Sequence, residues 1–262
     1  MRPKCPLSER CTPSRNSIAL VTVSEWSRRS LSDYFGVPAD RIHVIPEAPS
    51  RVFREGVARS AAPACLSQSG WPDGRTYFVY VGGFNPHKNL HRLVRAFARA
   101  AGEHPAVDVG LLMVGDFAGD NFHADLDALR AEIERLGVGG RVHFPGFVPD
   151  DDLRTLYSDA LALVIPSLEE GFGLPAVEAA ACGTPCVATQ NSPLPELLAG
   201  GGLFVAPTDE AALAGALSRL LDDEALCKEL GATAHERASA LTWEAAAQAA
   251  REALSAVARG AG

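Results

Sequence analysis

The chain has 262 residues, of which 47% are hydrophobic and 21% are charged, and its formal net charge is −8. This composition is that of an ordinary globular protein and excludes disordered, collagen-like and coiled-coil chains. A net acidic chain is also a poor candidate for non-specific binding to nucleic acid, so we expect no nucleic-acid partner.

The N-terminal residues 1–17 are polar and show no periodicity, so we expect a disordered tail, and they have no apolar core of the kind that a secretory signal needs. No run of about 18 apolar residues occurs further along the chain, which predicts no transmembrane segment. The six cysteines form no Cys-x-x-Cys pair and no zinc-like cluster, which predicts free thiols and no metal site. These features favour a cytoplasmic protein, either free or peripheral to the inner membrane face.

Residues 18–45 are predicted to form a small strand–helix–strand unit. The apolar run IALVTVS is a strand that ends at Ser24, a typical helix N-cap, and the following helix stops at Gly36. A second strand, RIHVIP, is closed by Pro46. Residues 47–75 are rich in Pro, Ala, Ser and Gly, which is typical of a linker.

From Tyr77 onward, strands and helices alternate with few breaks. An apolar stripe from Leu90 to Ala101 predicts one of the helices, and two or three more follow between Thr208 and about Arg259. The strands are almost wholly apolar, as in a parallel sheet covered on both faces. We therefore expect an α/β fold with a doubly wound parallel sheet, whose ligands lie beyond the C-terminal strand ends. The predicted strands are YFVYVGG, DVGLLMVG, VHFPG, LALVIPS, PCVAT and GLFVAP.

The loop GGFNPHKN follows the first of these strands and is suited to bind an anion. Gly82 and Gly83 let the backbone approach a ligand closely, and Lys88 stands where the next helix opens. Helix N-termini bind phosphate, and a lysine adds a mobile positive charge suited to a diphosphate. The alternative is an ordinary strand-to-helix turn with a solvated lysine, and this loop alone leaves both open.

The loop in SLEEGFGLPAVEAAACGTP presents bare backbone N–H groups where another helix starts. Glu178 lies about one turn into that helix, and its carboxylate can reach back because helical side chains lean toward the N-terminus. A carboxylate can accept two hydrogen bonds at once and so suits vicinal hydroxyls. We expect Glu178 and Glu170 to bind the hydroxyls of a ligand in this way. The alternative is that both are ordinary solvated or dipole-favoured helix residues.

The segment E-G-F-G-L-P-x-x-E, from Glu170 to Glu178, resembles the donor-site motif of the retaining GT-B glycosyltransferases of family 4 (glycosyl transferases group 1). VGGFNPHKNLHRLVRAF, EAAACGTPCVAT and NSPLPELLAGGGLFVAP are similar to other segments of that family, and the resemblance covers about residues 18–256. It implies a Rossmann-like C-terminal donor-binding domain with a truncated N-terminal domain. The implied organisation is a tail over 1–17, a remnant of the acceptor domain and a linker over 18–75, a nucleotide-sugar-binding domain over 76–240, and a crossover helix over 241–262.

The resemblance implies transfer of a sugar, with retention, from a UDP-, GDP- or similar nucleotide-sugar to a glycan, lipid or small-molecule acceptor, with no cofactor or metal. Lys88 would contact the diphosphate and Glu170 the hydroxyls of the transferred sugar, and these are the implied catalytic residues. Glu178 would bind the ribose. The other implied donor contacts are Gly82, Gly83, Phe147, Val148, Gly171, Phe172, Gly173 and Leu174.

The chain departs from the family pattern in its cations and in its length. Many relatives carry arginine at the positions of Gly83 and His87, so Lys88 is the permanent cation expected on the diphosphate. His87 would be cationic only near or below about pH 6.5. A complete N-terminal domain would need roughly 150 more residues. The alternatives are therefore a non-catalytic nucleotide-sugar-binding fragment or one half of a split enzyme completed by a second chain, whereas the Glu170–Glu178 motif disfavours an epimerase or a phosphorylase.

Overall fold

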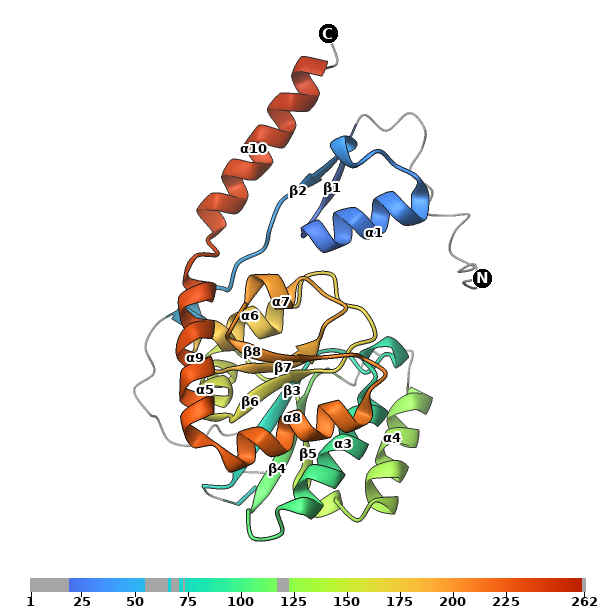
Figure 1. Ribbon diagram of the computed structural model, residues 1–262, viewed down its shortest axis with the longest axis vertical. Helices are drawn as coiled ribbons and strands as arrows, with labels where there is room; N and C mark the ends of the chain where they lie inside the picture. The colour runs from blue at the N-terminus through green and yellow to red at the C-terminus, as the bar shows by residue number, and fades with distance from the viewer. Residues whose placement is uncertain (1–18, 55–65, 67–70, 73, 117–122, 261–262) are drawn as a thin grey trace. The chain divides into compact units, whose positions relative to one another are not determined.

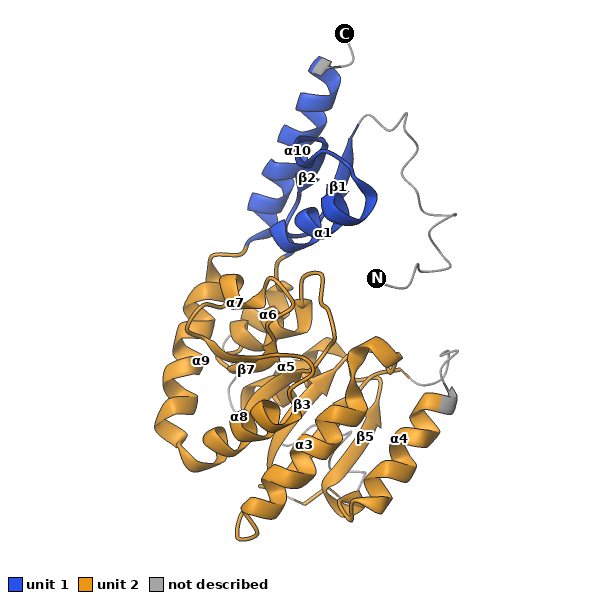
Figure 2. Cartoon of the chain, turned by 45° about the vertical axis from the view of Figure 1, so that its right-hand side comes forward, with its two compact units in different colours: residues 1–47, 242–262 blue, residues 48–241 orange. Residues whose placement is uncertain are grey.

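The computed structural model describes residues 19–54, 66, 71–72, 74–116 and 123–260. The tail expected over 1–17 and much of the linker expected over 47–75 lie outside these residues. The chain divides into two compact units, which Figure 2 colours blue and orange. The smaller unit comprises residues 1–47 and 242–262, and the larger comprises residues 48–241.

The smaller unit contains the strand–helix–strand element that the sequence predicts. Strands β1 (Leu20–Thr22) and β2 (Ile42–Val44) form a two-stranded parallel sheet, joined through α1 (Glu25–Phe35) and the 3₁₀ turn η1 (Ala39–Arg41). Ser24 caps α1, because its hydroxyl accepts the Ser27 N–H at 3.0 Å, and Gly36 ends it with φ 67°. Helix α10 (Trp243–Gly260) belongs to the same unit.

The larger unit is built on a six-stranded parallel sheet in the order β5-β4-β3-β6-β7-β8 (Figure 1). The predicted parallel α/β fold is thus confirmed, and each predicted strand is present. The strand bounds are β3 (Thr76–Val81), β4 (Val109–Val114), β5 (Val142–Gly146), β6 (Ala162–Ile165), β7 (Cys186–Thr189) and β8 (Gly202–Val205).

Helices cover the sheet because alternate strand residues point to opposite faces and both sets are apolar. Figure 1 shows α3, α4 and α8 on one face, where Phe78, Leu111 and Val164 belong to one buried cluster with them. Of the predicted stripe from Leu90 to Ala101, every member except Ala98 is buried. The helix bounds are α3 (Leu90–Glu103), α4 (His123–Arg135), α5 (Asp150–Asp159), α6 (Leu174–Ala181), α7 (Leu194–Leu197), α8 (Glu210–Asp222) and α9 (Glu224–Ser239), with 3₁₀ turns η2 (Arg51–Arg54), η3 (Pro86–Lys88) and η4 (Gly139–Arg141).

The strand order fixes where a ligand site is expected. From β3 the chain proceeds to β4 and β5 on one side, and it then returns to β6 on the other side. The C-terminal ends of β3 and β6 therefore lie side by side, and the chain leaves them in opposite directions. Such a switch point opens a crevice in doubly wound sheets. The loops that follow β3 and β6 are the two that carry Lys88 and Glu170.

Part of the segment with linker composition packs into the larger unit. Phe53 in η2 is 2% exposed, and its ring centroid lies 5.7 Å from that of Tyr157. Arg54 donates to the backbone oxygens of Ala238 and Leu241, at the end of α9. Trp71 lies so close to Gly110 of β4 that a Cβ there would meet the indole at 2.2 Å. These residues complete the sheet's covering rather than only connecting two units.

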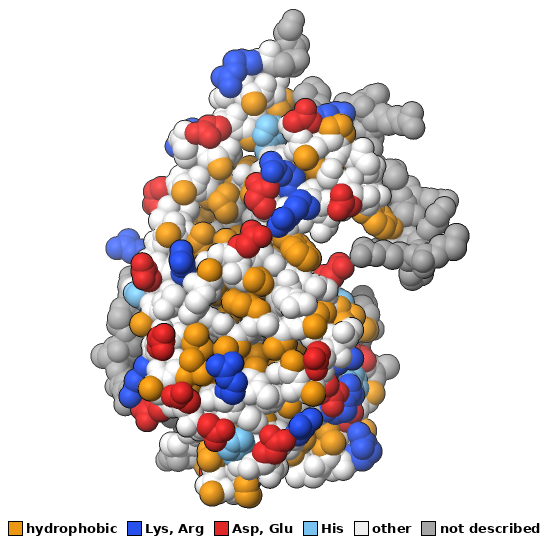
Figure 3. All heavy atoms as spheres, in the orientation of Figure 1, with side chains coloured by type: hydrophobic (Ala, Val, Ile, Leu, Met, Phe, Trp, Pro, Cys, Tyr) orange, Lys and Arg blue, Asp and Glu red, His pale blue; other side chains and the backbone are white. Residues whose placement is uncertain are grey.

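The surface agrees with the mixed charge of the sequence. On the face shown in Figure 3, acidic and basic side chains are interspersed over the larger unit. Within the described residues, no helix is both long enough and apolar enough to cross a membrane.

Candidate functional site

The loop after β3 is shaped by a tyrosine that lies beneath it. Gly82 has φ 153°, and a Cβ there would lie 2.8 Å from the Tyr80 hydroxyl oxygen. That hydroxyl donates to the Gly83 backbone oxygen, and the Gly82 N–H donates to Val114 O at 3.0 Å. Burial, and then the charge of Glu170, raise the pKa of Tyr80 well above its usual value, so Tyr80 keeps its proton and donates. Gly82 therefore has a local steric reason, whereas a Cβ at Gly83 would meet only Asn85, at an ordinary 3.7 Å.

Lys88 ends the short turn η3, and α3 begins two residues later. Its N–H donates to Asn85 O at 2.8 Å, which closes the turn. Its ammonium nitrogen lies 2.9 Å from Oε2 of Glu170, and the two side chains are 22% and 17% exposed. The two residues predicted to act together thus touch, although 82 positions separate them.

The loop after β6 holds the Glu170 carboxylate in place. The Ser167 side chain is fully buried, and its hydroxyl donates to Glu170 Oε2 at 3.2 Å. The Glu170 N–H donates to Asn191 O at 3.1 Å, which fixes the backbone against the loop after β7. Oε2 therefore accepts from both Lys88 and Ser167. Oε1 has no hydrogen-bond partner among the described residues, which leaves it to receive a ligand hydroxyl.

Helix α6 begins beside this carboxylate. Gly173 has φ 83°, and a Cβ there would lie 2.8 Å from a methyl carbon of Leu194 in α7. Only glycine suits both this conformation and this contact. The first N–H groups of a helix have no intrahelical acceptor and favour an anion. The start of α6, four residues after Glu170, is therefore a second feature suited to an anion.

Glu178 in α6 contacts Tyr157 of α5. It accepts a hydrogen bond from the Tyr157 hydroxyl at 3.2 Å. Burial raises the pKa of Tyr157 well above its usual value, and the charge of Glu178 adds to this, so Tyr157 stays protonated. Two further predicted residues, Phe147 and Val148, precede α5: Phe147 is 74% exposed, whereas Val148 is buried. Phe172 is also buried, with 3% of the residue exposed.

His87 is a weaker cation than the sequence suggests. Desolvation, and then the neighbouring Lys88 ammonium, lower the pKa of His87 below its usual value of 6.5, while Glu170 opposes the shift. His87 is therefore neutral at pH 7, and Lys88 supplies the positive charge in this turn.

Sequence reasoning missed the residues that support the pair: Tyr80, Ser167, Asn89 and Asn191. Tyr80 lies in an apolar strand and Ser167 lies in a loop. Neither belongs to a recognisable motif, and their hydrogen bonds depend on the fold. Asn89 carried a weak signal, because asparagine is one of the few side chains that tolerate a left-handed backbone at a helix start.

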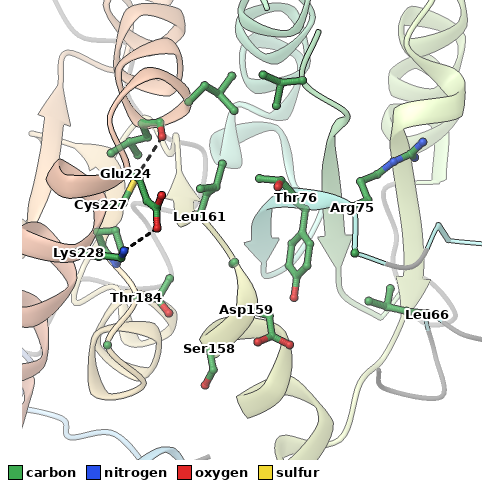
Figure 4. Close-up of a pocket in the computed structure, with 18 of the residues that line it drawn as sticks. Leu66, Arg75, Thr76, Ser158, Asp159, Leu161, Thr184, Glu224, Cys227 and Lys228 are labelled. Carbon is green, nitrogen blue, oxygen red and sulfur yellow. Dashed lines mark hydrogen bonds and ion pairs between the residues drawn. The ribbon is translucent and has the colours of Figure 1, made fainter. Parts of the chain in front are cut away.

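A second hollow lies at the opposite edge of the sheet, where the strands begin (Figure 4). It has a volume of about 730 Å³, and its lining includes Thr76, Leu161 and Thr184. Several of its polar groups are already paired: Lys228 with Glu224 at 2.6 Å, and Thr184 with Tyr157 O at 2.6 Å. Because ligands of parallel sheets bind at the C-terminal strand ends, the candidate site is the Lys88–Glu170 edge. In the described part of the chain, no three His, Cys, Asp or Glu side chains gather as metal ligands would.

Comparison with known proteins gives a family and several relatives. The family model described as "Glycosyl transferases group 1" matches residues 65–237. The chain is 32% identical to O-antigen chain mannosyltransferase B of Escherichia coli, over 86% of this chain and 57% of that protein. It is 36% identical to D-inositol 3-phosphate glycosyltransferase of Acidothermus cellulolyticus, over 82% of this chain and 48% of that protein. The chain thus spans about half the length of these relatives.

A solved structure shares the fold. The structure of Anabaena Alr3699/HepE in complex with UDP-glucose superposes with a TM-score of 0.79 over 92% of this chain and 65% of that one, at 23% identity. At this identity the likeness shows the fold alone.

Proposed function

Because the chain belongs to the glycosyl transferases group 1 family, we propose that its larger unit binds a nucleoside-diphosphate sugar at the C-terminal ends of β3 and β6. The observation that carries this proposal is the 2.9 Å contact between Lys88 and Glu170, one residue from each loop of the switch point. The sheet is that of a GT-B C-terminal domain. The UDP-glucose bound by Alr3699/HepE supports the class of donor.

Each predicted residue has a role in this proposal. Lys88 binds the diphosphate, assisted by the backbone N–H groups at the start of α6. Glu170 accepts hydroxyl hydrogen bonds from the sugar through Oε1, which Ser167 and Lys88 leave open by holding Oε2. Glu178 binds the ribose hydroxyls, while its Oε2 also accepts the hydrogen bond from the Tyr157 hydroxyl. The remaining donor contacts are proposed for Gly82, Gly83, Phe147, Val148, Gly171, Phe172, Gly173 and Leu174.

The reaction proposed is sugar transfer with retention. The bond between the anomeric carbon and the diphosphate oxygen breaks, and its electron pair stays on the diphosphate. The acceptor oxygen bonds to the same face of the sugar, and the acceptor's proton passes to the departing diphosphate. Negative charge therefore grows beside Lys88, whose ammonium stabilises it within a preorganised site.

We propose that binding of the acceptor needs protein surface beyond that of the described residues. In the described part of the smaller unit the sheet has two strands, whereas an independently stable sheet usually needs three or more strands. We infer that residues 19–45 and α10 belong to an N-terminal acceptor domain, the remainder of which is supplied by further polypeptide. Residues 76–240 then form the donor half, and an alternative role of this chain is donor binding without transfer.

Calorimetric titration with UDP, GDP and their sugars tests the proposal. Binding of at least one of these by the chain is expected, with a Glu178→Ala variant weaker by about 1.5–3 kcal/mol through loss of a charge-assisted hydrogen bond. Absence of binding by the unaltered chain would overturn the proposal. Transfer of labelled sugar is then measured with and without an added N-terminal domain of a relative. Transfer with or without the added domain supports the hypothesis of a glycosyltransferase. Binding of the nucleotide sugar without transfer in both mixtures supports the non-catalytic alternative.

Tyr80→Phe should weaken nucleoside-diphosphate binding, whereas Tyr77→Phe should not. Both hydroxyls are on β3 and donate to a backbone oxygen, Tyr80 to Gly83 and Tyr77 to Leu156 at 3.0 Å. Each variant removes the hydrogen bond to a backbone acceptor that is buried at Leu156 and partly buried at Gly83, and should lose about 1–3 kcal/mol of unfolding free energy. Only the Tyr80 variant also loosens the glycine loop, so its affinity for UDP or GDP should fall several-fold at a temperature where both variants are folded. Equal affinities in the two variants would contradict this role of Tyr80.

A further inference from the structure

Asn89 has an unusual backbone for its residue type. It is the one non-glycine residue with a positive φ, 60°, in the described part of the chain. Asparagine tolerates this conformation better than most residues, but it still costs energy relative to an ordinary helix start. Such strain persists where surrounding contacts hold it and is concentrated at functional sites. The contacts that hold Asn89 are therefore informative.

The Asn89 amide uses both its N–H groups to join three strand ends. Its Nδ2 donates to Pro166 O and to Pro207 O, each at 2.9 Å. Pro166 directly follows β6, and Pro207 lies two residues after β8, whereas Asn89 itself follows β3. Its Oδ1 accepts from Arg92 at 2.8 Å, and the same Arg92 nitrogen donates to Pro207 O. Every hydrogen-bonding group of the amide is thus engaged.

Hydrogen bonds to the loop after β6 are made on both sides of Lys88. On one side, His87 O accepts the Leu168 N–H at 2.9 Å. On the other side, Asn89 binds Pro166 O at 2.9 Å. Pro166 and Leu168 themselves flank Ser167, which donates to Glu170. The backbone bearing Lys88 is therefore fastened twice to the backbone that carries the support of Glu170.

We propose that Asn89 is a positioning residue that fixes the backbone of Lys88, and with it the ammonium, at the place where the diphosphate binds. This inference rests on the proposed function, and it adds a residue that touches neither the diphosphate nor the sugar. Aspartate at this position keeps the shape but turns a carboxylate oxygen toward two carbonyl oxygens. Glycine keeps the backbone conformation and removes the tether, which makes the two substitutions complementary.

The test compares Asn89→Gly, Asn89→Asp and the control Tyr77→Phe, all titrated with UDP and GDP at a temperature where each is folded. Both Asn89 variants should bind at least about tenfold more weakly than the unaltered chain, because one charge-assisted contact is misplaced. Tyr77→Phe should bind as the unaltered chain does. Amide exchange at Leu168 should be faster in Asn89→Gly than in Tyr77→Phe, because its acceptor His87 O is no longer fastened.

A double-mutant cycle separates positioning from general destabilisation. In a Lys88→Ala background, Asn89→Gly should have little further effect on UDP or GDP affinity, because the group that Asn89 positions is gone. Additive losses would overturn the inference, and so would unchanged affinity in both Asn89 variants. If the unaltered chain binds neither nucleotide, the result contradicts the proposed function and therefore also the inference that rests on it. Binding by the unaltered chain and by Asn89→Gly alike defeats the Asn89 inference alone.

Discussion

Lys88→Ala should weaken binding of UDP or GDP at least about tenfold and up to about a hundredfold, the equivalent of about 1.5–3 kcal/mol for a hydrogen bond to a charged group. Lys88 is the positive charge of its turn, because the lowered pKa of His87 leaves that ring neutral at pH 7. The variant also removes the ion-pair partner of Glu170, whose Oε2 then keeps only the hydrogen bond from Ser167. The remaining carboxylate then repels the diphosphate, which adds to the loss. Calorimetric titration at pH 7.5 measures the effect.

Lys228→Ala is the matched control. Lys228 is the other lysine in the described part of the chain, and it also pairs with a glutamate, Glu224, at 2.6 Å. That pair lies at the opposite edge of the sheet, with side chains 74% and 81% exposed. An exposed pair contributes about 0–1 kcal/mol, so neither stability nor nucleotide affinity should change much. Equal loss of affinity in both lysine variants would show a general charge effect and would contradict the role of Lys88.

Local signals predicted the elements because their physical causes are local. The cap at Ser24, the stop at Gly36 and the apolar stripe of α3 each depend on residues within one or two turns. A ligand site at the C-terminal strand ends also followed from sequence, since alternating apolar strands and helices leave few topologies, but the strand order that defines the switch point came from the structure. The encounter of Lys88 with Glu170 could therefore be predicted from the two loops they occupy.

The supports of that pair could not be predicted, because they bind backbone oxygens far away in the chain. Asn89 reaches Pro166 and Pro207 across 77 and 118 positions, and any residue offers the same carbonyl group. Composition also misled at residues 47–75, where small and turn-forming residues suggested a linker. Phe53 is nevertheless buried against Tyr157, and Trp71 packs against Tyr77 and His143, because burying an aromatic ring is strongly favourable.

Glu170→Gln should change two affinities in opposite directions. Without the carboxylate charge, Lys88 is released from its ion pair and repulsion of the diphosphate is removed. Binding of UDP or GDP should therefore become tighter by about fivefold, which corresponds to about 1 kcal/mol. Binding of the corresponding nucleotide sugar should instead weaken about tenfold or more, because a charge-assisted contact to the sugar hydroxyls is lost.

The preference for a nucleotide sugar over the bare diphosphate is thus the quantity to measure, since it isolates Glu170 from Lys88. Lys88→Ala weakens both ligands alike and leaves the preference unchanged, because the diphosphate is common to them. Glu224→Gln, which removes the same charge from the Lys228 pair, should also leave it unchanged. A Glu170→Gln variant that lost affinity for both ligands equally would place Glu170 in support of Lys88 rather than on the sugar. A variant with unaltered affinities would remove Glu170 from the site altogether.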